Sequence, residues 1–224
     1  MLIPSIDLMG GKIVQLVQGE RKALEFDDFR YWIERFSEYP LVQLIDLDAA
    51  MGHGHNRELI AMICKRLPCQ AGGGIRSIER AQEVLKLGAR RVIFGSALLK
   101  DGKINTALAG DAAKTLGSEH LTFAIDSREG KVAIKGWKEG TSVLPAEMIR
   151  ALDAYCSAFL YTHIESEGTM TGFPTEVARE LAGLTRKRLI VAGGIRSRAE
   201  IDELDAIGVD AVVGMAIYTG AMKA

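Results

Sequence analysis

The chain has 224 residues, of which 48% are hydrophobic and 25% charged, as is typical of a globular protein with a sizeable core. Its 28 basic and 29 acidic side chains give a net charge of −1, which argues against nucleic acid or an anionic membrane as a partner. No apolar run approaches the roughly 18 residues of a membrane span, and no cleavable leader precedes the first apolar run. We therefore expect a cytoplasmic monomer without membrane or nucleic-acid contacts.

Short apolar runs alternate along the chain with amphipathic stretches of about ten to fifteen residues, the pattern of β/α units. The predicted strands are residues 2–6, 41–45, 68–71, 91–94, 121–125, 158–161, 189–192 and 211–213. The predicted helices are residues 27–38, 56–66, 77–87, 104–116, 145–155, 175–183, 197–207 and 216–222. Ser77 and Ser197 stand at N-cap positions, and Gly88 and Gly208 stand where glycine ends a helix.

Eight such units without a linker predict one α/β domain over residues 1–224, a closed (β/α)8 TIM barrel. An open, doubly wound sheet is the alternative. The second half of the sequence repeats the first: Ile6-Asp7 returns as Ile125-Asp126, a shift of 119 residues, and Gly73-Gly74 returns as Gly193-Gly194, a shift of 120. The repeat predicts two half-barrels, about 1–117 and 118–224, and an open sheet would not need halves that match so closely.

Aspartates end the first and fifth predicted strands. Active sites of such barrels lie at the carboxyl ends of the strands, where Asp7 and Asp126 would face each other from opposite sides of the ring. Two facing carboxylates suit a general acid and a general base. The alternative is that each aspartate only caps a turn. The recurrence of an aspartate at the equivalent strand end of both halves favours a role in catalysis. Asp46 and Asp48, after the second strand, are further candidates at this end.

Glycine-rich turns follow four late strands of the two halves. The triplet 72–74 pairs with Gly95-Ser96 in the first half, and Gly193-Gly194 pairs with Gly214 in the second. Such turns place backbone N–H groups around a phosphate. The need for glycine in a tight β/α turn would explain one such pair of turns, but it explains the second pair poorly. The sequence therefore predicts a ligand with a phosphate at each end.

The cysteines and histidines give no sign of a metal. Cys64, Cys69 and Cys156 are an odd number without metal-like spacing, so we expect free thiols in a reducing compartment. His53 and His55 share a glycine-rich loop with no third ligand nearby, which is typical of a solvated loop. No Gly-x-Gly-x-x-Gly motif follows the first strand, which argues against a nicotinamide cofactor. We expect neither a metal nor a cofactor.

Motifs along nearly the whole chain resemble those of the histidine-biosynthesis ProFAR isomerase family. They are IPSIDLMGGK (3–12), LIDLDAA (44–50), GGGIRS (72–77), IDSR (125–128), KGW (135–137), EGT (167–169) and AGGIRS (192–197). The resemblance implies a half-barrel duplication and an Amadori rearrangement of an aminoaldose to an aminoketose, without a cofactor. It implies a small-molecule substrate that carries two phosphates.

The resemblance also assigns residues. Asp126 matches the general acid, Asp7 the general base and Thr162 a threonine that assists the acid, whereas Trp137 matches a residue that stacks on the substrate. The expected substrate- and phosphate-binding residues are Gly74, Arg76, Gly95, Ser96, Trp137, Gly168, Thr169, Gly193, Gly194 and Gly214. The segments 9–21 and 127–141 are long and rich in glycine and charge, so we expect them to be loops that close over the substrate.

The chain departs from the family pattern at four positions. It has Gln15 where arginine is usual, Gln43 where histidine is common, Glu167 in place of aspartate, and His163 where an acid is typical.

Three alternative functions stay open. A bifunctional isomerase that also acts on phosphoribosylanthranilate in tryptophan synthesis is suggested by the stretch 47–57, and Gln15 argues against it. The sister cyclase of the pathway fits the strand-one motif less well. A non-catalytic phosphate-binding paralogue would explain the departures but not the two intact aspartates.

Overall fold

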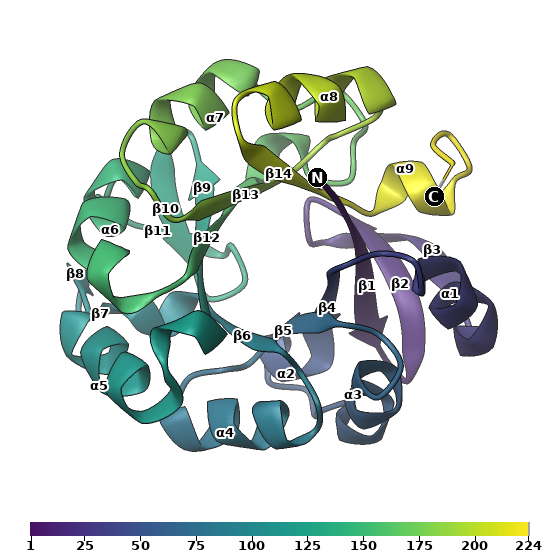
Figure 1. Cartoon of the computed structure of the whole chain (residues 1–224), viewed down its shortest axis with the longest axis horizontal. Coiled ribbons are helices and arrows are strands. Elements are labelled where there is room, and N and C mark those ends of the chain that lie inside the picture. The colour runs from purple at the N-terminus through teal and green to yellow at the C-terminus, as the bar shows by residue number, and fades with distance from the viewer. Residues whose placement is uncertain (224) are drawn as a thin grey trace.

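The computed structural model of the protein describes residues 1–223, in which parallel strands form a closed ring (Figure 1). The ring consists of β1 (Leu2–Met9), β4 (Val42–Asp46), β5 (Cys69–Gly72), β6 (Arg91–Phe94), β9 (Leu121–Arg128), β12 (Ala158–His163), β13 (Arg188–Ala192) and β14 (Val209–Val213). Each strand pairs in parallel with the next, β6 joins β9 between the two halves, and β14 closes the ring on β1. This confirms the predicted (β/α)8 barrel and excludes the open sheet.

Helices surround the ring and cover its outer face (Figure 1). They are α1 (Phe29–Phe36), α3 (Arg57–Cys64), α4 (Ile78–Lys86), α5 (Thr106–Leu116), α6 (Pro145–Leu152), α7 (Thr175–Ala182), α8 (Arg198–Ala206) and α9 (Met215–Tyr218). Ser77 and Ser197 cap α4 and α8 as predicted, because their hydroxyls accept the backbone N–H of Arg80 and Glu200. No helix among residues 1–223 has the length and apolar character needed to cross a membrane.

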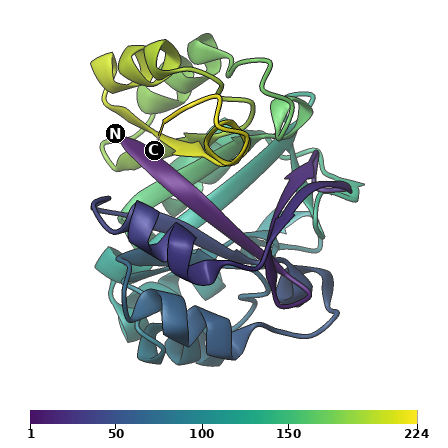
Figure 2. The same cartoon turned by 90° about the vertical axis from the view of Figure 1, so that its right-hand side faces the viewer.

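The two expected lid segments are hairpins rather than irregular loops. The first continues into β2 (Lys12–Val17) and β3 (Arg21–Phe26), which pair antiparallel with each other and with β1. The second forms β10 (Lys131–Ile134) and β11 (Glu139–Gly140), which extend β9. In Figure 2 the β2–β3 hairpin rises from the carboxyl-end side of the barrel, away from the N-terminus. The two segments are ordered because their backbone groups pair with each other and with the ring strands. Their closure over a substrate stays a prediction.

Several short elements lie between the main ones. They are α2 (Leu47–Met51), η1 (Ser96–Leu98), β7 (Leu99–Lys100), β8 (Lys103–Ile104), η2 (Ser118–His120), η3 (Asp153–Tyr155) and η4 (Ile164–Ser166). The boundary between the predicted half-barrels, near residue 117, falls between α5 and η2. The derivation of the two halves by duplication stays a prediction.

Two apolar layers hold the barrel together. The larger layer fills the space between the strands and the helices and includes the fully buried Phe36, Phe94, Phe123 and Phe159. The smaller layer fills the inside of the ring with Ile3, Leu41, Ile93, Ala158, Leu160, Ile190, Ala192 and Val212. Because the inner layer plugs the barrel, a ligand has access only at the ends of the strands.

An aromatic cluster joins the first and last helices of the chain. The Tyr218 ring of α9 lies 4.1 Å from the Trp32 ring of α1, measured between centroids, and it also contacts Phe26 and Phe36. Tyr218 also donates a hydrogen bond of 3.0 Å from its hydroxyl to the carbonyl of Ser5 in β1. These contacts fix the last helix, whose N-terminal residue follows Gly214, against the strand that carries Asp7.

Candidate functional site

A cavity of about 560 Å³ opens at the carboxyl ends of the ring strands, a volume in the usual range for a small-molecule site. Most of the predicted site residues line it: Asp7, Gly74, Arg76, Gly95, Ser96, Asp126, Trp137, Thr162, Gly168, Gly193, Gly194 and Gly214. Thr169 is outside the lining, and its hydroxyl instead bonds the carbonyl of Ser166 and the hydroxyl of Thr171. Thr169 therefore stabilises the loop after β12, and its expected role in binding stays a prediction.

The two glycine turns have the same backbone geometry. Gly73 and Gly193 have φ of +96° and +118°, and Gly74 and Gly194 have φ of +66° and +77°. A Cβ at Gly73 would lie 2.1 Å from the carbonyl oxygen of Asp46, and one at Gly193 would lie 2.4 Å from that of His163. The turns thus require glycine both for conformation and for close approach. They provide two equivalent backbone concavities on opposite sides of one cavity.

The turns that follow β6 and β14 also match. Gly95 has φ −118° and ψ −109°, and Gly214 has φ −110° and ψ −90°. Each begins a short helical turn whose N-terminus points toward the cavity side of the ring, η1 in one half and α9 in the other. Backbone N–H groups at such positions attract anions. Each half of the mouth therefore repeats the arrangement expected of a phosphate site.

Asp7 lies near the end of β1 and is half-buried in the cavity wall. Its Oδ1 accepts a hydrogen bond of 2.9 Å from the Ser5 hydroxyl. Burial raises the pKa of Asp7 from 3.8 to about 6, and the Ser5 hydrogen bond opposes part of that rise. The carboxyl is therefore mostly ionised at neutral pH, yet it accepts a proton more readily than an exposed aspartate, as a general base must.

Asp126 lies at the equivalent position of β9 and is also half-buried. Burial raises its pKa, and hydrogen bonds from Trp137 and Thr162 partly oppose the rise. Thr162 sits beside it because Thr162 and Asp126 are register partners of β12 and β9. The structure thus brings the three residues together as the sequence predicted.

The strand register explains why the two aspartates differ. The partner of Asp126 on the next strand is Thr162, whereas the partner of Asp7 is the apolar Ile45. Asp46 pairs with Leu8 and is therefore the equivalent of His163, which pairs with Ser127, and not of Thr162. One aspartate therefore has a hydroxyl neighbour from the adjacent strand where the other has a hydrocarbon.

Asp46 is fully buried, and both of its carboxylate oxygens accept hydrogen bonds from the segment that follows β4. It accepts hydrogen bonds from the backbone and side chain of Asn56, each 2.8 Å long, and one from the backbone N–H of Ala49. Asp48 accepts 2.7 Å and 2.8 Å bonds from Gly10 N–H and Asn56 Nδ2. Neither aspartate lines the cavity, so both candidates serve the local structure instead of the site.

Glu167 supplies a third carboxyl that lines the cavity. Burial together with the negative charges of Asp7 and Asp126 raises its pKa from 4.5 to about 8. At neutral pH Glu167 therefore holds its proton while Asp7 is mostly ionised. The sequence showed Glu167 only as a substitution within the EGT motif, because the proximity of acids from β1, β9 and the loop after β12 is visible only in the folded chain.

The comparisons with known proteins decide the family. The model of the family described as "Histidine biosynthesis protein" matches residues 1–223. The protein belongs to this family. A relative from Methanocaldococcus jannaschii is 35% identical over 98% of this chain and 94% of its own, and one from Thermus thermophilus is 36% identical over 99% and 96%. A third, from Methanosarcina barkeri, is 36% identical over 98% and 93%. Each is named as an imidazole-4-carboxamide isomerase, with two 5-phosphoribosyl groups in the name.

Two departures of the chain from the family motifs lie in the cavity wall. Gln15 of β2 is 4% exposed, its Nε2 donates to the carbonyl of Val14, and its Oε1 lies beside Gly214. Gln43 of β4 accepts a 3.0 Å hydrogen bond from Gln70. Both are neutral amides, so neither adds a positive charge to the cavity wall.

The cations of the cavity lie at its rim. Arg76, Lys135 and Lys138 line the mouth, and Arg76 donates a 2.7 Å hydrogen bond from Nη2 to the carbonyl of Ala50. The backbone N–H of Lys135 donates to the Ser96 hydroxyl at 3.1 Å, so the β10–β11 hairpin contacts one phosphate turn directly. No group of three or more metal-ligating side chains occurs within residues 1–223, and His53 and His55 are exposed.

Proposed function

We propose that the protein is the isomerase of histidine biosynthesis that converts the aminoaldose ProFAR to its aminoketose. One observation carries the proposal: two carboxyls, Asp7 and Asp126, at equivalent strand ends share one cavity with two equivalent glycine turns. The turns would bind the two phosphates of an extended substrate, and the carboxyls would act on the atoms between them. Sequence identity of about 35% to relatives named as such isomerases supports the same conclusion.

The proposed reaction moves protons within one substrate and needs no external electron acceptor. Asp126 protonates the ribose ring oxygen while the C1′–O bond breaks, and the nitrogen lone pair forms the C1′=N bond of a Schiff base. Asp7 then removes the proton from C2′, so that the C2′–H electrons form the C1′=C2′ bond of an enolamine and the C1′=N π electrons return to the nitrogen. Protonation at C1′ and loss of the C2′ hydroxyl proton give the ketone.

The three carboxyls suit these transfers. Asp7, with a pKa of about 6, is mostly ionised at neutral pH and is ready to accept a proton, and Thr162 and Trp137 hold the Asp126 carboxyl in place. Glu167 retains a proton, which limits the negative charge that a bisphosphorylated substrate meets. The apolar floor formed by Ile93, Leu160 and Val212 excludes water beneath the reacting atoms.

We place this enzyme in the cytoplasm, where amino-acid biosynthesis takes place, and we propose that it acts as a monomer. The large hydrophobic side chains that residues 1–223 expose are scattered over separate elements: Tyr31, Met51, Met62 and Leu144. Isolated apolar side chains of this kind do not form the contiguous patch of an interface.

The decisive test is a spectrophotometric assay with ProFAR and, separately, with phosphoribosylanthranilate, together with rescue of histidine and tryptophan auxotrophs. We expect turnover of ProFAR and rescue of the histidine auxotroph alone, because the neutral Gln15 offers no charge to a substrate carboxylate. Rescue of both auxotrophs would instead establish a bifunctional isomerase. Rescue of neither, with retained affinity for a bisphosphorylated ligand, would establish a binding protein.

A further inference from the structure

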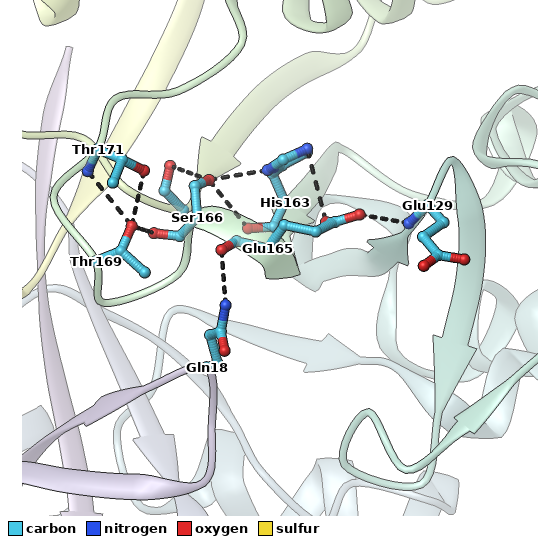
Figure 3. A network of polar contacts seen from close by, with 8 residues as sticks. Gln18, Glu129, His163, Glu165, Ser166, Thr169 and Thr171 are labelled. Atoms are coloured by element: carbon cyan, nitrogen blue, oxygen red, sulfur yellow. Dashed lines mark hydrogen bonds and ion pairs between the residues drawn. The ribbon is translucent and has the colours of Figure 1, made fainter.

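Figure 3 shows a chain of polar contacts around the loop after β12, outside the proposed acid and base. Its centre is Glu165, in the short η4 turn after β12. The backbone carbonyl of Glu165 accepts a 2.9 Å hydrogen bond from Nε2 of Gln18, and the backbone N–H of Gln18 donates a 3.0 Å bond to the carbonyl of Glu167. These bonds tie the tip of the β2–β3 hairpin to the loop after β12.

The carboxylate of Glu165 reaches the opposite hairpin. Its Oε1 accepts the backbone N–H of Glu129, the first residue of the turn between β9 and β10. Glu129 and Gly130 have φ of +52° and +73°, as in the two-residue turns of tight hairpins, so this N–H has a fixed direction. Strand β10 leads from this turn to the turn between β10 and β11, which carries Trp137, so Glu165 holds the start of the strand that leads to the indole.

On its other side, Glu165 contacts a histidine that leads to a phosphate turn. Oε2 of Glu165 is buried without a hydrogen bond within the described chain, and it lies 3.6 Å from Nε2 of His163. Nδ1 of His163 lies 2.9 Å from the Ser166 hydroxyl, which in turn donates a 3.1 Å bond to the carbonyl of Gly193. The contacts therefore run from the hairpin turn to the glycine turn after β13.

This group of serine, histidine and glutamate differs from a hydrolytic triad. Ser166 is only 6% exposed, and its single hydroxyl proton is directed at the carbonyls of Gly193 and His163. Its oxygen therefore accepts from Nδ1–H of His163 and is not available as a nucleophile. The group lies beneath the rim, where its geometry suits support of neighbouring loops.

We propose that Glu165 is a positioning residue, which together with His163 links the Gly193 turn to the β9–β10 hairpin and holds Trp137 over the cavity. The two hairpins meet at that indole: a Cβ built on Gly19 would lie 2.7 Å from Cε3 of Trp137, so the ring packs on the Gly19 backbone. Glu165 bonds both hairpins, one through its carbonyl and one through its carboxylate. The inference rests on the proposed function in that Trp137 would stack on the substrate.

The test uses Glu165→Ala and Glu165→Gln, with Glu147→Ala as the matched control. The Glu147 carboxylate also accepts a backbone N–H, that of Leu144 at 2.8 Å, but on the outer helix α6. Labelling with 5-fluorotryptophan gives a ¹⁹F resonance for each of the two tryptophans, and Trp137→Phe assigns them. This measurement reports on the hairpin in the free protein, without substrate.

We expect Glu165→Ala to move the Trp137 resonance toward the solvent-exposed shift and leave that of Trp32 in place, whereas Glu147→Ala moves neither. We expect kcat/KM for ProFAR to fall about 10-fold or more in Glu165→Ala, the effect of losing one charge-assisted hydrogen bond. In Glu165→Gln, which keeps an acceptor for the backbone N–H of Glu129, kcat/KM should fall less. An unchanged Trp137 resonance in Glu165→Ala would overturn the inference. A shifted Trp137 resonance in Glu165→Ala, together with a wild-type protein that does not turn over ProFAR, would retain the inference and refute the proposed function.

Discussion

The Ser5 hydroxyl donates a 2.9 Å hydrogen bond to Oδ1 of Asp7, two residues further along β1. Successive odd residues of β1 face the inside of the ring, so the bond lies within the cavity wall. The Ser5 carbonyl in turn accepts the Tyr218 hydroxyl. The proposed base is thus held by its own strand, which the last helix holds in place.

Removal of the Ser5 hydroxyl should shift the pH dependence of activity. The hydrogen bond stabilises ionised Asp7, so Ser5→Ala raises the Asp7 pKa further above about 6. A base works when ionised, so the rising limb of kcat/KM should move to higher pH by about 0.5 to 1 unit. Tyr218→Phe is the control, since it leaves this hydroxyl in place. A limb at the wild-type position in Ser5→Ala would contradict the role of Ser5.

Glu167 should set the falling limb of the same profile. Below its pKa of about 8 Glu167 is neutral, and above it the site gains another negative charge that opposes a bisphosphorylated substrate. Activity should therefore rise through about pH 6 and fall above about pH 8. Glu167→Gln stays neutral, so its falling limb near pH 8 should disappear. Measurement of kcat/KM from pH 5 to 9 in both proteins checks this, and an unchanged limb would assign it to another group.

Neutral replacements of the two aspartates should separate catalysis from binding. Asp7→Asn and Asp126→Asn should each lower kcat by about 10²-fold to 10⁴-fold, with binding of a bisphosphorylated ligand largely unchanged in calorimetry. Wild-type-like turnover in either variant would remove its acid or base assignment.

The same replacement of Asp7 should stabilise the fold. Because the folded pKa of Asp7 is raised, its favourable contribution is complete below the unfolded value near 4 and is lost as pH rises through about 6. The asparagine of Asp7→Asn does not ionise, so the variant does not lose stability as the pH rises. Its free energy of unfolding at pH 8 should exceed that of the wild type by about 3 kcal/mol, the equivalent of a rise in pKa from 3.8 to about 6, and the difference should nearly vanish near pH 4. Equal stabilities at pH 8 would argue against a raised pKa.

Two glycine-to-alanine replacements test whether the turn at Gly194, after β13, has room for a side chain. Gly194 and Gly208 have nearly the same φ, +77° and +73°, but a Cβ at Gly194 would lie 2.7 Å from Ser166 Cβ and 2.8 Å from Gly172 O, whereas Gly208 has open space. Gly208→Ala should cost about 1 kcal/mol of stability from backbone strain alone. Gly194→Ala should cost about 3 kcal/mol or more and raise KM. Equal costs in thermal unfolding would show that the turn has room.

Much of the barrel could be predicted because its signals are local. Short apolar runs, serine N-caps and terminal glycines at residues such as Ser77 and Gly88 reflect the preferences of single segments, and all eight strands were found. The facing positions of Asp7 and Asp126 also followed, since alternating β/α units fix which strand ends meet. The hairpins were missed because their pairing depends on β1 and β9 as templates.

The barrel, the two matched glycine turns and the pair of aspartates followed from the amino-acid sequence, because each depends on a residue type at a fixed place within a repeated unit. Tertiary structure alone decided the environments of these groups. It buried Asp46 under Asn56, set Thr162 beside Asp126 but Ile45 beside Asp7, and brought Glu167 close enough to both aspartates to keep its proton. Burial raises the pKa of all three carboxyls, hydrogen bonds oppose the rise for Asp7 and Asp126, and neighbouring negative charges add to it for Glu167. Most of these contacts come from segments that are far apart in the chain.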